Sequence, residues 1–196
     1  MAMPLTHPEL PTSTARVELE GVSEGELLEL ASVGRRRRRL AEVDELVLAA
    51  QWAVVQGTAR DGRDPMVTPG GAGTPEVREF AVAELGMALE SHALTARALI
   101  ADALDLVHRL PLVWVRVRAG ECEPWVARRV AVLSRALTSG QVVVVDRAVA
   151  RVIGVHAPST VLQVAAAKVV EAAPEELRAG AGAGAAGAVC AVVAGR

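Results

Sequence analysis

The sequence has few aromatic and amide side chains. It contains no tyrosine or asparagine, one phenylalanine and three tryptophans, although 52 % of its 196 residues are hydrophobic. Alanine and valine supply much of that fraction, so a core can only be built from small and branched side chains, which favours closely packed helices. The single lysine, Lys168, beside abundant arginine is the residue usage of a GC-rich bacterial genome.

Cysteine and net charge are also low. The two cysteines, Cys122 and Cys190, lie far apart and outside any Cys-X-X-Cys pair, so they predict neither a zinc site nor a disulfide framework. We therefore expect a reduced, cytoplasmic protein with no metal or other cofactor. The formal net charge is −2, which does not by itself predict a nucleic acid or an anionic membrane as partner. Any basic surface must be local.

Neither end of the sequence predicts membrane insertion. Residues 1–22 contain three prolines and no basic stretch followed by an apolar one, so we expect a disordered leader and no signal peptide. Residues 175–196 are rich in alanine and glycine, which partition weakly into lipid, and the run is short for a span. We favour a disordered, low-complexity tail over a membrane helix.

A long first helix is predicted over residues 23–57. Ser23 and Glu26 have the spacing of a capping box, and apolar residues recur at intervals of three and four as far as Gly57. The run Arg35–Arg39 lies inside this helix. Five consecutive helical residues point to more than one side, and acidic residues lie nearby, so a solvated, salt-bridged turn is favoured over a nucleic-acid patch.

Residues 58–74 are rich in glycine and proline and predict a linker, and Thr74, Pro75 and Glu76 have the features of a helix start. The next helix is expected to end near Leu89. The one that follows, to Pro111, has a clear apolar half. Its other half is predicted to be polar and solvated and comprises Arg97, Asp102, Asp105, His108 and Arg109.

Two short segments have patterns that are typical of strands: in residues 112–118 valine alternates with a larger side chain, and residues 142–145 are all β-branched. Their short length and their helical neighbours favour helix or irregular structure. Further helices are predicted from Pro124, from Ser139 to Arg151, and from Ser159 to just before Pro174. Together these patterns predict an all-α protein, a multi-helix orthogonal bundle whose compact domain spans residues 75–174.

One set of short motifs, taken in order, resembles the 13E12 repeat family, also called domain of unknown function 222. The resemblance covers about half of the chain, from Pro75 to Glu171. It rests on EFAVAEL at 79–85, ALIADALDLVHRLP at 98–111, Trp114, Ala119-Gly120, Trp125-Val126-Ala127-Arg128, Leu137 before Ser139, and Val145-Asp146.

Members of that family are mostly actinobacterial, and many carry this helical module ahead of a C-terminal HNH endonuclease domain. Such a nuclease needs a histidine-rich metal site. In this chain the four histidines are scattered, and nothing after Glu171 resembles an HNH cluster. The resemblance therefore implies a non-enzymatic module whose nuclease is missing, because the chain is truncated or frame-shifted, or because it is a naturally short relative.

A basic surface in the C-terminal half is the leading functional candidate. Between Arg109 and Arg151 there are eight arginines and three acids, and arginine forks suit phosphates. Ordinary solvated helix faces explain the same pattern equally well. The nucleic-acid-binding residues we predict are Arg116, Arg118, Arg128, Arg129 and Arg135.

Other signals are weaker. The two helices around Ser91 fit a plain helical hairpin better than a helix-turn-helix. Trp114 and Trp125 are expected in the core, which leaves no aromatic platform for single strands. His108 is expected to be solvated. Cys122, flanked by two glutamates, is expected to be unreactive because like charge disfavours its thiolate.

The sequence thus predicts a helical module that assists binding of duplex DNA and has no small-molecule substrate. The alternative is a packing or oligomerisation module, including a possible homo-oligomer, in which the arginines are incidental. A gene remnant without function is the third possibility. The first two differ in whether the five predicted arginines converge on one face.

Overall fold

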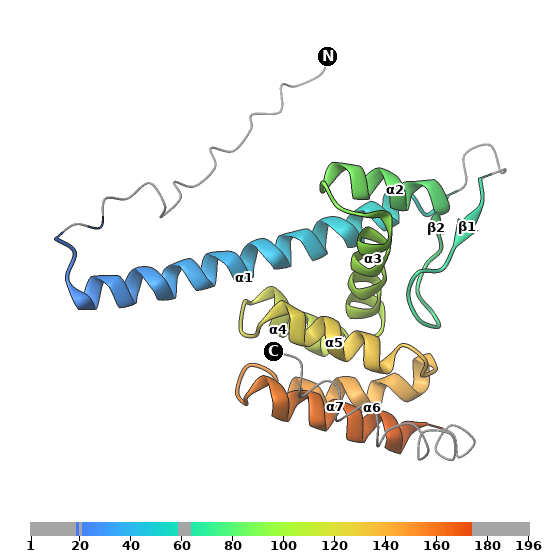
Figure 1. Ribbon diagram of the computed structural model, residues 1–196. Coiled ribbons are helices and arrows are strands. Elements are labelled where there is room, and N and C mark those ends of the chain that lie inside the picture. The colour runs from blue at the N-terminus through green and yellow to red at the C-terminus, as the bar shows by residue number, and fades with distance from the viewer. Residues whose placement is uncertain (1–18, 20, 59–63, 174–196) are drawn as a thin grey trace.

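The computed structural model describes residues 19, 21–58 and 64–173. Within these ranges the protein is mostly helical, as predicted, with seven helices and two short strands (Figure 1). The predicted leader and tail, residues 1–22 and 175–196, fall almost entirely outside the described residues. The elements are α1 (Glu24–Val55), β1 (Met66–Val67), β2 (Val77–Arg78), α2 (Glu79–Ala88), α3 (Ala93–His108), α4 (Pro111–Arg118), α5 (Pro124–Ser134), α6 (Ser139–Ala150) and α7 (Pro158–Ala172).

The long first helix begins at the predicted capping box. The Ser23 amide donates to the Glu26 carboxylate at 2.9 Å, and the Glu26 amide donates to the Ser23 hydroxyl at 3.4 Å. Towards its C-terminal end α1 buries Val43, Leu46 and Ala49 in the same core as the later helices. Its first turns, before Arg35, extend away from the rest of the protein (Figure 1).

The predicted start of the second helix is wrong. Thr74, Pro75 and Glu76 precede β2, and α2 begins only at Glu79. The Thr74 amide and hydroxyl both donate to the Gly71 carbonyl, at 3.1 and 2.9 Å, so this threonine closes a turn and does not cap a helix. Part of the predicted linker is also ordered, because β1 pairs antiparallel with β2 in the register Met66 with Arg78.

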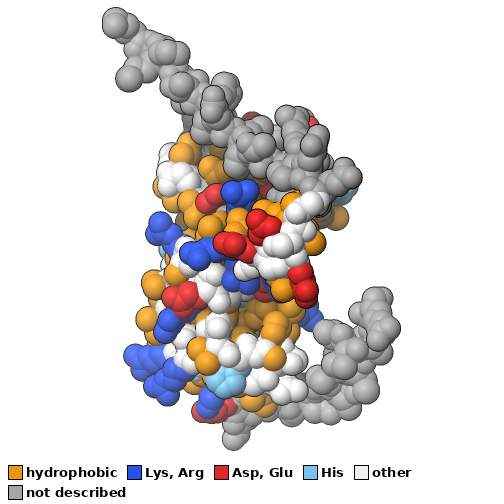
Figure 2. Space-filling view, turned by 90° about the vertical axis from the view of Figure 1, so that its left-hand side faces the viewer, with side chains coloured by type: hydrophobic (Ala, Val, Ile, Leu, Met, Phe, Trp, Pro, Cys, Tyr) orange, Lys and Arg blue, Asp and Glu red, His pale blue; other side chains and the backbone are white. Residues whose placement is uncertain are grey.

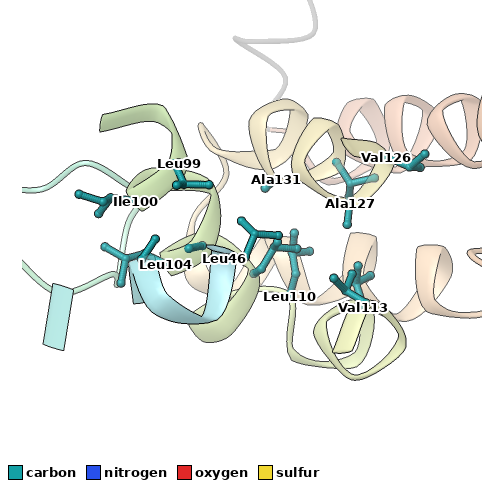
Figure 3. Packing of buried hydrophobic residues seen from close by; sticks show 14 of the residues in the cluster. Leu46, Leu99, Ile100, Leu104, Leu110, Val113, Val126, Ala127 and Ala131 are labelled. Carbon is teal, nitrogen blue, oxygen red and sulfur yellow. The ribbon is translucent and has the colours of Figure 1, made fainter. Parts of the chain in front are cut away.

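The core is built from alanine, valine, leucine and isoleucine, as the lack of aromatic residues predicts (Figure 3). Leu46 from α1 and Ile100 and Leu104 from α3 are fully buried there. α3 lies at the centre of the fold, because α1, α2, α4 and α5 all pack against it. It therefore cannot be exposed as a recognition helix, and the preference for a plain helical hairpin around Ser91 agrees with the structure.

The four last helices form two layers, in which α4 packs on α6 and α5 packs on α7, while α6 and α7 lie side by side. α3 runs across their direction in Figure 1, as expected of an orthogonal bundle. Residues 112–118 and 142–145, expected to be helical or irregular and not strands, are helical, with Pro111 and Pro124 in the first turns of α4 and α5. Thr138 and Gln141 form a second capping box, at the start of α6.

Candidate nucleic-acid interface

The five predicted arginines belong to two groups. Arg116 and Arg118 lie in α4, whereas Arg128 and Arg129 lie in α5 and Arg135 directly follows it. Arg116 pairs with the exposed Glu121 at 2.7 Å. Arg118 and Arg129 are exposed and make no ion pair with any described residue. The ion pairs of the two groups involve different acids, Glu121 for Arg116 and Asp102 and Asp105 for Arg128 and Arg135, so the five arginines do not form one network among the described residues.

Two carboxylates on α3 bring Arg128 and Arg135 together. Arg128 Nε donates to Asp102 Oδ2 at 2.7 Å, and Arg135 Nη2 donates to Asp102 Oδ1 at 2.7 Å. Arg135 Nε also donates to Asp105 Oδ2 at 2.7 Å. These are charge-assisted hydrogen bonds with short, well-directed geometry, so they fix where the two guanidinium groups lie.

The acidic residues and Arg109 are buried, which corrects the predicted polar half of α3. Asp102, Asp105 and Arg109 are 3 %, 0 % and 4 % exposed. Their spacings of three and four place them on one side of the helix. That side faces α5 rather than solvent. Of the residues predicted to be polar and solvated, Arg97 and His108 are exposed.

Arg109 ties α3 to the end of α5. Its Nη1 donates to Asp105 Oδ1 at 3.1 Å and to the Arg135 carbonyl at 3.2 Å. Its Nη2 donates to the carbonyls of Ser134 at 3.1 Å and Leu137 at 2.6 Å. Carbonyls at a helix C-terminus lack partners within the helix. The buried guanidinium therefore supplies the donor for the Arg135 and Leu137 carbonyls, adds a second donor to the Ser134 carbonyl, which also accepts from the Leu137 amide, and sets the position of α5 relative to α3.

The loop before β2 closes over this network. The Gly71 amide donates to Asp105 Oδ1 at 2.8 Å. A Cβ atom at position 71 would lie 1.6 Å from Arg109 Nη1 and 2.6 Å from the Arg135 carbonyl oxygen. Only glycine fits there. The predicted linker thus supplies a backbone donor to the network, which the sequence alone did not indicate.

The network carries excess positive charge. Arg109, Arg128 and Arg135 face two carboxylates, Asp102 and Asp105, which leaves one positive charge in excess. Burial acts to lower the pKa of Arg135, but its hydrogen bonds to Asp105 and Asp102 outweigh this and raise that pKa. The guanidinium therefore stays charged. Its side chain and that of Arg128 are 30 % and 37 % exposed, so both also reach solvent.

An open groove lies beside this network. It has a volume of about 290 Å³ and is lined by Asp102, Trp125, Arg128, Arg129, Val132 and Leu162. Trp125 is 48 % exposed, so its predicted place in the core is wrong, whereas Trp114 is half-buried against the core. The groove therefore combines arginine with an accessible aromatic ring. The ring of Trp125 is available to stack on a base. On the sequence alone, an aromatic platform is excluded because this tryptophan is expected in the core.

A second arginine cluster holds α1 against the turn between α4 and α5. The nearly buried Glu123 accepts from Arg35 at 2.9 Å, from Arg38 at 3.0 Å and from Arg39 at 2.8 Å. Arg39 also donates to the Gly120 carbonyl at 2.8 Å. Three of the five arginines in the run 35–39 are salt-bridged, but their main partner is remote in sequence. Within the run only Arg38 binds an acid of its own helix, Glu42.

The other polar candidates have structural roles. Asp146 accepts from the amides of Leu112 at 3.1 Å and Val113 at 3.0 Å, so it caps α4, and burial raises its pKa. Burial, more than the flanking glutamates, raises the pKa of the Cys122 thiol to about 11. Within the described ranges no group of three or more His, Cys, Asp or Glu residues is placed to hold a metal ion.

Charge is mixed on the face drawn in Figure 2, where basic and acidic side chains alternate with apolar ones. None of the helices among the described residues is both long and apolar enough to cross a membrane.

No family model, curated protein or solved structure matches the chain. The resemblance to the 13E12 repeat family stays a prediction.

Proposed function

We propose that this chain is a non-catalytic, cytoplasmic helical module that binds duplex DNA through the phosphate backbone. The observation that supports this most is the fixed position of Arg128 and Arg135 on Asp102, beside the unpaired Arg129. Guanidinium groups that are already ordered lose less side-chain entropy when a ligand binds. DNA binding at this site can be tested on the purified chain.

Donor groups remain for phosphate at this site. Arg128 uses only Nε for Asp102, and Arg135 uses Nε and Nη2 for the two carboxylates. The remaining guanidinium N–H groups, together with those of Arg129, make no hydrogen bond to a described residue and suit phosphate oxygens. Such contacts carry no base sequence information, so we expect salt-dependent binding with little preference for sequence.

The test is fluorescence anisotropy with a labelled duplex of random sequence. Arg129→Ala is the informative variant, because its side chain has no partner whose loss would disturb the fold. We expect it to weaken binding several-fold. Arg151→Ala is the matched control, since Arg151 is exposed and lies outside the groove; it removes the same charge and should change affinity much less. Equal effects of the two variants, or no binding at low salt, would contradict the proposal.

The alternative, a helical oligomerisation module, is favoured by a different observation. The exposed face of α1 bears large apolar residues, among them Val33, Leu40 and Val47. If the chain forms oligomers and does not bind DNA, this alternative replaces the first proposal. The two functions use different surfaces, so they can be tested separately.

A further inference from the structure

The exposed side of α1 carries a regular apolar column. Val33, Leu40, Val47 and Val54 are each seven residues apart and are 40 %, 37 %, 36 % and 59 % exposed. A seven-residue step returns to nearly the same side of a helix, with a drift of about 20°. Single exposed valines are ordinary, but four at a constant heptad spacing are not explained by solvent exposure alone.

The fold of the single chain does not use this column to build its core. The face of α1 that packs against α3 consists of other residues, Val43, Leu46, Ala49 and Ala53, which are at most 4 % exposed. Leu40 lies beside the turn between α4 and α5, since a Cβ atom at Gly120 would lie 3.1 Å from its Cδ2. All four members of the column nevertheless remain accessible, over about six turns of the helix.

Charges on both sides of Leu40 suggest what covers it. Arg36 and Arg37 precede Leu40 by four and three residues, and Asp44 follows it by four. Residues at these spacings share one side of a helix with Leu40. None of the three makes an ion pair with a described residue, although Arg35, Arg38 and Arg39 of the same run do. The unpaired charges thus lie along the apolar column.

We propose that two copies of this chain associate through this column, with their α1 helices antiparallel and a two-fold axis at Leu40. In that arrangement Arg36 of each copy faces Asp44 of the other, and Val33 faces Val47. A parallel pair in register would place arginine against arginine, which is repulsive. Charge complementarity therefore selects both the partner, a second copy, and the direction.

The shape of the protein is compatible with this arrangement. The segment of α1 that precedes Arg35 extends away from the other helices (Figure 1). In an antiparallel pair this segment lies along the second copy's α1, where Val47 and Val54 are accessible. Each body packs against the adjacent side of its own α1, through Val43 and Leu46, and reaches Leu40 at Gly120, so the second helix has to approach from the side of Leu40 that faces away from the body.

The experiment is sedimentation velocity on the full chain over a hundred-fold range of concentration, at low and high salt. We expect a dimer whose dissociation constant rises with salt. Arg36→Asp should weaken it at least ten-fold by placing like charges together, and Arg36→Asp combined with Asp44→Arg should restore it, because the pair is then reversed. Both positions are exposed, so neither change disturbs the core.

Leu28→Asp provides a matched control. Leu28 is 67 % exposed on the same extended segment of α1 as Val33, but by helical spacing it is on the side of Arg35 and Arg39, away from the column. It should leave the dimer unchanged, whereas Val33→Asp should abolish it. A chain that is monomeric at every concentration, or a dimer that responds equally to both substitutions or fails to be rescued by the charge reversal, overturns the proposal.

Discussion

Replacing the buried Arg109 with methionine should destabilise the fold substantially. The change removes four hydrogen bonds, one to Asp105 and three to the carbonyls of Ser134, Arg135 and Leu137. Methionine keeps an unbranched apolar chain in the same space, so the effect isolates the loss of the guanidinium group. Asp105 retains two donors, from Gly71 and from Arg135.

The size of the effect follows from burial. Breaking a buried ion pair costs about 3–5 kcal/mol when the other charge is left alone, which is an upper bound here because Asp105 keeps two donors. The carbonyls of Arg135 and Leu137 lose their donor, at about 1–3 kcal/mol each, whereas the Ser134 carbonyl keeps the Leu137 amide. Water reaches the Arg135 side, where the side chain is 30 % exposed, and offsets part of this. We therefore expect a loss of about 4 kcal/mol in the free energy of unfolding and a Tm lower by about 12 °C.

Urea denaturation followed by circular dichroism measures this loss. Arg116→Met is the matched control, because Arg116 pairs with Glu121 where the two side chains are 48 % and 43 % exposed. Exposed pairs contribute little, so the control should change stability by less than about 0.5 kcal/mol. If Arg109→Met also lies within about 1 kcal/mol of the wild type, the network does not hold α5 in place.

Three further predictions concern other contacts. Hydrogen bonds from Arg39, and then from Arg35, lower the pKa of Glu123 below its ordinary value of 4.5. The ionised Glu123 therefore stabilises the fold fully above pH 4.5, and this stabilisation is lost as the pH falls through the lowered pKa of the folded state. Amide exchange in α1 should rise in that acidic range, and Glu123→Gln should remove the pH dependence. Gly71→Ala should destabilise the fold by more than about 2 kcal/mol in urea denaturation, whereas Gly140→Ala, where nothing lies within 4 Å, should be neutral or stabilising. In a Cys190→Ser background, Cys122 should react with a thiol reagent at pH 8 only after unfolding, because its pKa is about 11; fast reaction of the native protein would contradict this.

Much of the fold was predictable because it depends on local signals. The capping box at Ser23, Pro111 at the end of α3, Pro124 at the start of α5 and the apolar face of α3 all specify structure within a few residues. For the alternating segment 112–118, its helical neighbours argued against a strand but left helix and irregular structure open; it is helical. The false start at Thr74 shows the limit of such signals, since its hydroxyl bonds within a turn instead.

The site was less predictable because it depends on pairing between distant segments. Asp102 and Asp105 look like solvated residues of an amphipathic helix, and nothing local indicates that Arg128 and Arg135 will cover them. Likewise, Glu123 is remote in sequence from the arginines of α1 that bind it. The spacing of 102, 105 and 109 was the available signal, because it gathers two acids and a base on one side of α3.

The most direct test of the proposed DNA binding is the salt dependence of affinity. The logarithm of the association constant for a random duplex should fall linearly with the logarithm of salt concentration between roughly 50 and 200 mM, and Arg129→Ala should reduce that slope by about one. This result would mean that Arg129 neutralises a phosphate. A slope that is flat, or that is the same for wild type and variant, would contradict DNA binding through the groove beside Asp102 and Arg128.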